Sequence, residues 1–255
     1  SVGLPTSLKA AAFQGTWVNQ YTYVAPDLNE TVDWYIEVFG MQRGYSDKNQ
    51  VHLWYGDTGG DTLMIVRQAE AGEKTPRIEK IGFTINNWDR TIVETELQRL
   101  GRRPRSDSDK GFWFEDLDGN EIGLFARDYA LRPASAAVET VLWKAVSANH
   151  IVVLTDDYEG MASWYKNLLS LRQTRNSGRD TYLWLSDSVW IPTKVDRNGQ
   201  TSAMLKTVDH VAYSIETFEK ESVEKELERR KLKPELDAEY SFNCLDVNGF
   251  KTQVC

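Results

Sequence analysis

The sequence predicts an α+β fold of four βαβββ modules, paired into two tandem open barrels that are each a cupped mixed β-sheet. Three observations predict it. The second half of the chain repeats the first at a fixed offset, so that 78–104 aligns with 208–234. Each half divides again into two strand-and-helix units about 60 residues apart. The 255 residues are 41% hydrophobic and 27% charged, which is typical of a globular protein.

The first module opens with a strand over 17–26, rich in β-branched and aromatic residues. Asp27 is placed to cap the helix that follows, with Glu30 at the capping-box position. Apolar residues at spacings of four, three and four predict one buried helical face, and a glycine ends it. These residues are Leu28, Val32, Tyr35, Phe39 and the terminating Gly40. Short strands over 41–46, 50–56 and 61–67 complete the module.

The second module has a strand over 80–86 and a helix whose apolar stripe is Val93, Leu97 and Leu100. Two strands joined by a turn follow within 112–125. The third and fourth modules repeat this pattern at the same offset. We therefore divide the chain into an N-terminal arm (1–15), an N-terminal domain (16–127), a linker (128–146) and a C-terminal domain (147–255).

Charge and hydropathy exclude two classes of partner. A net charge of −8 argues against a nucleic-acid-binding protein whose affinity depends on a basic face. No apolar run approaches the roughly 20 residues that span a bilayer, so we expect no membrane insertion. We expect a cytoplasmic protein, or an exported one if a leader precedes Ser1.

The motifs of both halves resemble those of the vicinal-oxygen-chelate superfamily. A WYIEVFGM segment (34–41) lies in the first helix region, and DLDGN (116–120) or DVNGF (246–250) precedes the last strand of each half. This superfamily includes glyoxalase I, the bleomycin and fosfomycin resistance proteins and the extradiol dioxygenases. The resemblance implies paired βαβββ modules, with ligands for a divalent metal on the first and last strands of a cup.

The resemblance places the ligand positions of the C-terminal half at His150, His210 and Gln253. Two imidazoles beside one oxygen donor suit Fe(II), Mn(II), Zn(II) or Ni(II), although Gln253 stands where the superfamily has a carboxylate. The matching N-terminal residues are Gln20, Lys80 and Gly123, of which Lys80 brings a positive charge and Gly123 no side chain. We therefore expect the metal site in the C-terminal cup alone. No nucleotide or flavin is indicated.

Other polar and aromatic residues receive separate interpretations. Trp190 and Asn243 lie on strands next to the ligand positions and are candidate substrate-binding residues. No catalytic acid or base is identified, because Asn243 stands where the dioxygenases have a tyrosine. We interpret His52 as a hydrogen-bonded sheet residue and Trp54 and Trp184 as core residues. Asp116 and Asp246 open the last hairpins, where aspartate bonds its own backbone, so a structural role is expected.

These features are compatible with two alternative functions. The first is a metal-dependent enzyme, a lyase or isomerase or an extradiol-type oxygenase, acting on a small oxygen-chelating substrate in the C-terminal cup. The alternative is a metal-free protein that binds or sequesters a small molecule, as the bleomycin resistance proteins do. Four modules in one chain can complete both cups, so a monomer is feasible, and a homodimer is the alternative.

Overall fold

The computed structural model describes residues 11–56, 61–130, 143–176, 180–185, 190–194 and 207–255. The first half forms two βαβββ modules: β1 (Gly15–Ala25), α1 (Leu28–Phe39), β2 (Gln42–Ser46), β3 (Gln50–Tyr55) and β4 (Thr62–Gln68), then β5 (Arg77–Ile85), α2 (Arg90–Arg99), β6 (Arg105–Ser108), β7 (Gly111–Glu115) and β8 (Glu121–Phe125). The second half forms two more: β9 (Ala145–Leu154), α3 (Tyr158–Leu169), β10 (Arg172–Asn176), β11 (Asp180–Trp184) and β12 (Trp190–Lys194), then β13 (Thr207–Ile215), α5 (Lys220–Arg229), β14 (Glu235–Ala238), β15 (Ser241–Leu245) and β16 (Lys251–Val254). The predicted module pattern is confirmed.

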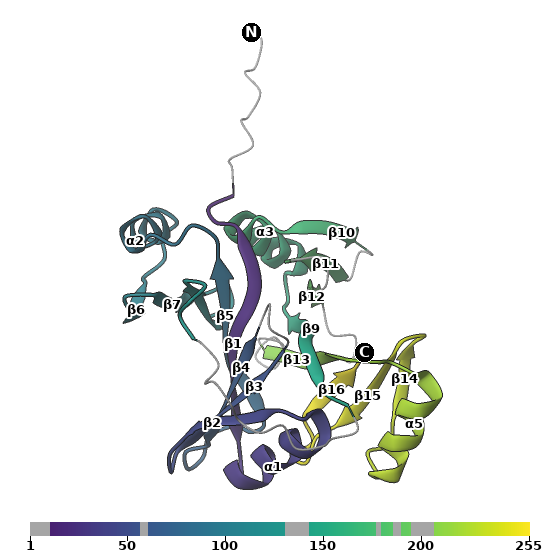
Figure 1. The fold of residues 1–255 in the computed structure, drawn as a ribbon. Coiled ribbons are helices and arrows are strands. Elements are labelled where there is room, and N and C mark those ends of the chain that lie inside the picture. Colours follow the sequence, from purple (N-terminus) through teal and green to yellow (C-terminus); the bar gives the residue numbers. More distant parts are fainter. Residues whose placement is uncertain (1–10, 57–60, 131–142, 177–179, 186–189, 195–206) are drawn as a thin grey trace.

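The strands form two eight-stranded mixed sheets of the same design (Figure 1). The first has the order β2-β3-β4-β1-β5-β8-β7-β6, and the second has the order β10-β11-β12-β9-β13-β16-β15-β14. In each sheet the opening strands of two modules pair antiparallel at the centre. Each opening strand also pairs parallel with the last strand of its own module. The first and last strands of all four modules therefore meet in the middle of a sheet.

The ends of helix α1 follow the predicted capping chemistry. The Asp27 side chain accepts a hydrogen bond from the Glu30 amide at 3.0 Å, and Gly40 ends α1 in the left-handed conformation (φ 61°). Asp157 caps α3 in the same way through the Gly160 amide at 2.9 Å. The predicted apolar face of α1 is buried. Helix α1 therefore presents an apolar face to the sheet.

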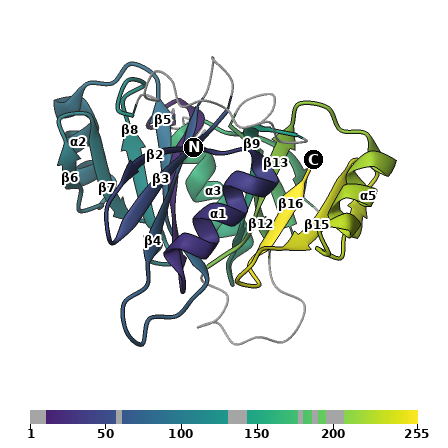
Figure 2. The same ribbon diagram turned by 60° about the horizontal axis from the view of Figure 1, so that its bottom comes forward.

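Reciprocal contacts join the two halves. Helix α1 packs on β3 and β4, and its Tyr35 hydroxyl donates to Asp246 in the β15–β16 turn at 3.1 Å. Helix α3 packs on β11 and β12, and its Tyr165 donates to Asp116 in the β7–β8 turn at 3.2 Å. Figure 1 shows α1 beside β16, whereas α2 and α5 lie at opposite ends of the molecule (Figure 2). Each half thus buries one helix against the last hairpin of the other.

Asp116 and Asp246 have the predicted structural role and a further one. One oxygen of each carboxylate accepts two backbone amides of its own turn, as expected. The other oxygen accepts tyrosine hydroxyls from the opposite half, including that of Tyr23 on Asp246. Burial raises the pKa of both carboxyls above the ordinary value. A hydrogen bond between the Tyr21 and Tyr213 hydroxyls at 2.8 Å also crosses between halves.

The domain boundaries stay a prediction. Residues 1–10 of the proposed arm and 131–142 of the proposed linker lie outside the described residues. Strand β9 begins at Ala145, slightly before the proposed start of the C-terminal domain. Among the described residues, no helix is long and apolar enough to span a membrane.

Candidate metal centre

Strand register places the three predicted ligand residues on one face of the second sheet. Ala212 in β13 pairs with His150 in β9 on one side and with Gln253 in β16 on the other. Side chains of directly paired residues project to the same face of a sheet. His210 lies two positions before Ala212 and therefore also projects to that face. The structure brings His150, His210 and Gln253 to one cavity of about 660 Å³.

The two histidines converge through their Nε2 atoms, which lie 3.2 Å apart. Their rings are nearly perpendicular, with centroids at 5.3 Å. Each residue is 6% exposed. Both side chains are therefore held inside the cavity floor with one ring nitrogen of each directed to the same point.

The other ring nitrogens are held by acceptors. His210 Nδ1 lies 2.6 Å from Asp209 Oδ2, and a carboxylate can only accept, so Nδ1 carries the proton. His150 Nδ1 lies 2.8 Å from Asn149 Oδ1, whose amide nitrogen donates to Ser214 Oγ. In the neutral rings both Nε2 atoms then present lone pairs. Two lone pairs this close together repel unless a proton or a cation lies between them.

Gln253 is 1% exposed, and both ends of its amide have hydrogen-bond partners. Its Nε2 donates to Asp237 Oδ2 at 2.9 Å, and its Oε1 accepts a weak hydrogen bond from Cys255 Sγ at 3.6 Å. Burial raises the pKa of Cys255 to about 12, so this thiol carries its proton. The amide oxygen is therefore the end of Gln253 that is left to act as a ligand.

Of the two predicted substrate-binding residues, the structure describes the side chain of Asn243 but not that of Trp190. Asn243 does not line the cavity; its Nδ2 donates to Asp237 at 3.3 Å, and its buried Oδ1 has no hydrogen-bond partner among the described residues. The backbone of Trp190 pairs in register with His150, but the side chain of Trp190 lies outside the described part of the structure.

One wall of the cavity was not predicted. The region of β14 and the following turn contributes Asp237, Glu239 and Tyr240, and Tyr182 lines the cavity from β11. Lys251 also lines the cavity, but its ammonium is paired with Asp209 at 3.0 Å. The wall is therefore acidic. Asp237 recurs as Asp107 at the repeat offset, and this was the signal available in the sequence.

The histidine pair fits a divalent ion in its donor chemistry and spacing. Two imidazole nitrogens bound at about 2.1 Å and at a right angle lie about 3.0 Å apart, close to the observed 3.2 Å. Within the described residues, no group of three or more His, Cys, Asp or Glu side chains is placed to hold a metal. Gln253, which lines the same cavity, carries an amide oxygen that could serve as a third ligand.

The corresponding floor of the first sheet is filled by an aromatic ring. Gln20, Gly82 and Gly123 form the matching row across β1, β5 and β8. A methyl group on Gly123 would overlap the Phe125 ring, and one on Gly82 would lie 2.7 Å from Phe125 Cε2. The ring of Phe125 therefore occupies the space that ligand side chains would need. The C-terminal counterpart of Phe125 is the much smaller Cys255.

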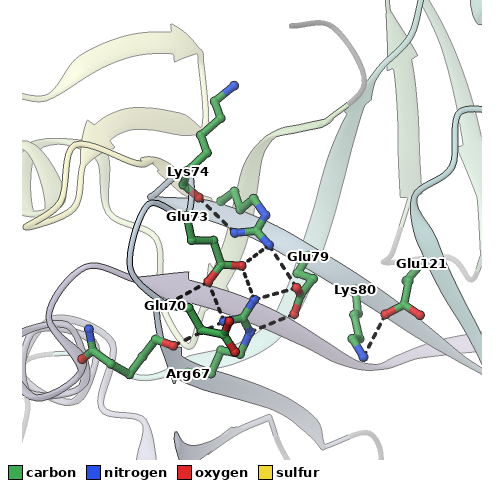
Figure 3. Close-up of polar contacts among 9 residues, drawn as sticks. Arg67, Glu70, Glu73, Lys74, Glu79, Lys80 and Glu121 are labelled. Atoms are coloured by element: carbon green, nitrogen blue, oxygen red, sulfur yellow. Dashed lines mark hydrogen bonds and ion pairs between the residues drawn. The ribbon is translucent and has the colours of Figure 1, made fainter. Parts of the chain in front are cut away.

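Lys80, the counterpart of His210, forms an ion pair with Glu121. Its ammonium lies 2.8 Å from Glu121 Oε2 and 5.4 Å from the centre of the Trp113 ring. Figure 3 shows this pair separate from the cluster in which Arg67 bridges Glu73 and Glu79. The three matching N-terminal positions thus offer one amide, one paired cation and no third side chain.

A second cavity of about 610 Å³ remains beside the filled floor of the first sheet. His52 and Trp54 both line it, together with Gln20 and Tyr129. Trp54 is buried (5% exposed), as its assignment to the core predicts, and its side chain also borders this cavity. Burial lowers the pKa of His52 below its ordinary value, which favours the neutral ring.

The comparisons with known proteins agree with this architecture. No protein-family model and no curated protein sequence matches the chain. Among solved structures, the 2,3-dioxygenase LapB from Pseudomonas sp. KL28 is similar with a TM-score of 0.71 at 14% identity, over 95% of this chain and 92% of that one. An extradiol ring-cleaving dioxygenase from Brevibacterium fuscum has a TM-score of 0.71 at 15% identity, over 99% and 74%. The Mn(II)-bound glyoxalase from Novosphingobium aromaticivorans has a TM-score of 0.71 at 19% identity, over 95% and 82%. The chain therefore has the fold of the vicinal-oxygen-chelate superfamily.

Proposed function

We propose that this protein is a metal-dependent enzyme that acts on a small oxygen-chelating substrate in the C-terminal cavity. The observation that carries the proposal is the convergence of His150 Nε2 and His210 Nε2 at 3.2 Å, with both Nδ1 atoms held by acceptors. This arrangement presents two neutral nitrogen donors to one point and favours a cation between them. The similar Mn(II)-bound glyoxalase and the similar dioxygenases support the same class of function.

The residues of the chain have distinct roles in this proposal. His150 and His210 hold the ion, and Gln253 offers its amide oxygen from the neighbouring strand. Asp209 keeps the proton on His210 Nδ1 and so keeps Nε2 available as a ligand. When bound, a divalent ion supplies a Lewis acid that polarises a substrate carbonyl or hydroxyl. The remaining cavity volume leaves room for a small substrate beside the histidines.

Metal content tests this proposal directly. The purified protein is incubated separately with Fe(II), Mn(II), Zn(II) or Ni(II), passed through a desalting column and analysed for bound metal. We expect one ion per chain for at least one metal, with binding lost in His150→Ala and His210→Ala. His52→Ala is the matched control, because this histidine lines the other cavity and should leave binding intact. Wild-type protein that retains none of the four metals would overturn the proposal.

A second candidate function is metal-free binding of a cationic or aromatic compound. It is favoured by the acidic wall formed by Asp237 and Glu239, which shares the cavity with the aromatic ring of Tyr182. Thermal unfolding with a panel of such compounds, with and without EDTA, separates the two functions. A stabilisation that EDTA leaves unchanged supports metal-free binding, and one that EDTA abolishes supports the enzyme.

A further inference from the structure

We propose that Asp237 is a positioning residue that selects the metal-binding orientation of the Gln253 amide. The inference rests on the metal site proposed above. It assigns a role to a cavity residue outside the predicted ligand set.

The geometry begins with the two oxygens of Asp237. Oδ2 accepts from Gln253 Nε2 at 2.9 Å, and Oδ1 accepts from Asn243 Nδ2 at 3.3 Å. Asn243 and Gln253 are directly paired across β15 and β16. Two side-chain amides from neighbouring strands therefore hold one carboxylate at the edge of the histidine cavity.

Only one end of the Gln253 amide can bind a cation, so its contact with Asp237 determines which end is available to the metal. A glutamine side chain ends in an oxygen that can bind a cation and an NH₂ group that cannot. A rotation of about 180° exchanges the two ends with little change in shape. An ionised carboxylate accepts hydrogen bonds only, so Asp237 can face the NH₂ end of Gln253 but not its oxygen. The carboxylate therefore turns the oxygen of Gln253 away from itself and leaves it available as a ligand.

The first sheet provides an internal comparison. Asp107 occupies the position of Asp237 and accepts a hydrogen bond from Trp113 Nε1 at 2.9 Å. The counterpart of Gln253 there is Gly123, which has no amide to orient. The acceptor thus recurs in both halves, but only the second half combines it with an amide and a converging histidine pair.

The test is a double-mutant cycle on metal affinity. Mn(II) and Zn(II) dissociation constants are measured by calorimetry or chelator competition for the wild type, Asp237→Asn, Gln253→Glu and the double variant. Glu239→Gln is the control, because it removes the same charge from the same cavity wall. Asp237→Ala serves as a second variant, and circular dichroism establishes that each protein is folded.

We expect Asp237→Asn to weaken metal binding by about 10–100-fold, the usual effect of removing a group that orients a ligand. Glu239→Gln should change affinity by less than about threefold. In the Gln253→Glu background, Asp237→Asn should also cost less than about threefold, because either oxygen of a carboxylate can bind the metal.

The outcomes separate this inference from the proposed function. If the wild type binds none of the tested metals, the proposed function fails and the positioning role fails with it. If the wild type binds metal but Asp237→Asn and Glu239→Gln have equal effects, only the positioning role is overturned. An equal loss from Asp237→Asn in both backgrounds also overturns it, since charge alone would then account for the effect.

Discussion

The hydroxyl of Tyr23, in the first strand of the chain, lies 2.5 Å from Asp246 Oδ2 in its last turn. The Asn248 amide donates to the same hydroxyl at 3.1 Å. Asp246 is 5% exposed and Tyr23 is fully buried. This contact links the two ends of the described chain through a buried polar group.

We expect Tyr23→Phe to lower the free energy of unfolding by about 1–3 kcal/mol, since it removes a buried hydrogen bond to a carboxylate. Urea denaturation monitored by fluorescence measures the change. Tyr45→Phe is the matched control, because Tyr45 donates to Asp47 at 2.8 Å but is 54% exposed. The control should change stability by less than about 0.5 kcal/mol. Equal effects of the two substitutions would contradict the buried role.

Asp209 should control metal affinity without contacting the metal. Asp209→Ala removes the acceptor that holds the proton on His210 Nδ1, so we expect affinity to fall by about 10–100-fold. Chelator competition measures the change. The exposed Asp156 in the same half supplies the control variant, Asp156→Ala. Identical affinities of the two variants would show that the carboxylate has no role in holding the ring.

The Phe125 ring should make Gly123 intolerant of a side chain. We expect Gly123→Ala to destabilise the protein by about 1–3 kcal/mol, because the added methyl overlaps a buried ring. In a Phe125→Ala background the same substitution should cost less, and the cost that remains comes from the Trp113 ring, whose Cζ3 atom would lie 2.7 Å from the added carbon. Thermal or urea unfolding of the four proteins measures this difference. An undiminished cost would show that the ring is not the obstacle.

The ion pairs of Glu226 should make the free energy of unfolding depend on pH in the acid range. Hydrogen bonds from Arg229 and Arg230, at 2.7 Å and 2.6 Å, lower the pKa of Glu226 from 4.5 to about 2. A carboxyl with a lowered folded-state pKa stabilises the protein fully above about pH 4.5 and loses that stabilisation as the pH falls toward 2. Glu226→Gln should therefore be less stable than the wild type by about 1 kcal/mol at pH 7 and nearly equal to it at pH 2.

Glu96→Gln is the control for this pH series. Glu96 pairs with Arg99 at the same spacing in α2, but Leu100 stands where α5 has Arg230. The effect of Glu96→Gln at pH 7 should be about 0.5 kcal/mol or less. A pH-independent difference between the wild type and Glu226→Gln would contradict the charge mechanism.

Much of the fold followed from local patterns. The cap at Asp27 and the apolar stripe of α1 are set by residues close together in the sequence, so the sequence predicted them. The convergence of His150 and His210 followed from the repeat, because matched positions on two opening strands meet where those strands pair.

Contacts across the sheets could not be predicted in the same way. Asp237 lies on an exposed edge strand, where an acidic residue is ordinary, and only the partner amide of Gln253 gives it a role. The tyrosines on Asp246 lie in the opposite half of the chain, where no local pattern connects them to this turn. The burial of Trp54 was predicted from its repetition in both halves, but its contact with the second cavity was not, because repetition fits a cavity position as well as a core position.

Tyrosine hydroxyls of each half donate to a buried carboxylate of the other half, and this has a consequence if the chain is cut between the halves. A fragment ending near residue 130 would carry the Asp116 carboxylate without its Tyr165 donor, and the remaining fragment would carry Asp246 without Tyr23 and Tyr35. Each piece would expose a carboxylate-bearing turn shaped for the other. The two pieces should therefore reassemble by complementation when mixed, because the piece that carries Asp246 needs the N-terminal piece to supply Tyr23 and Tyr35.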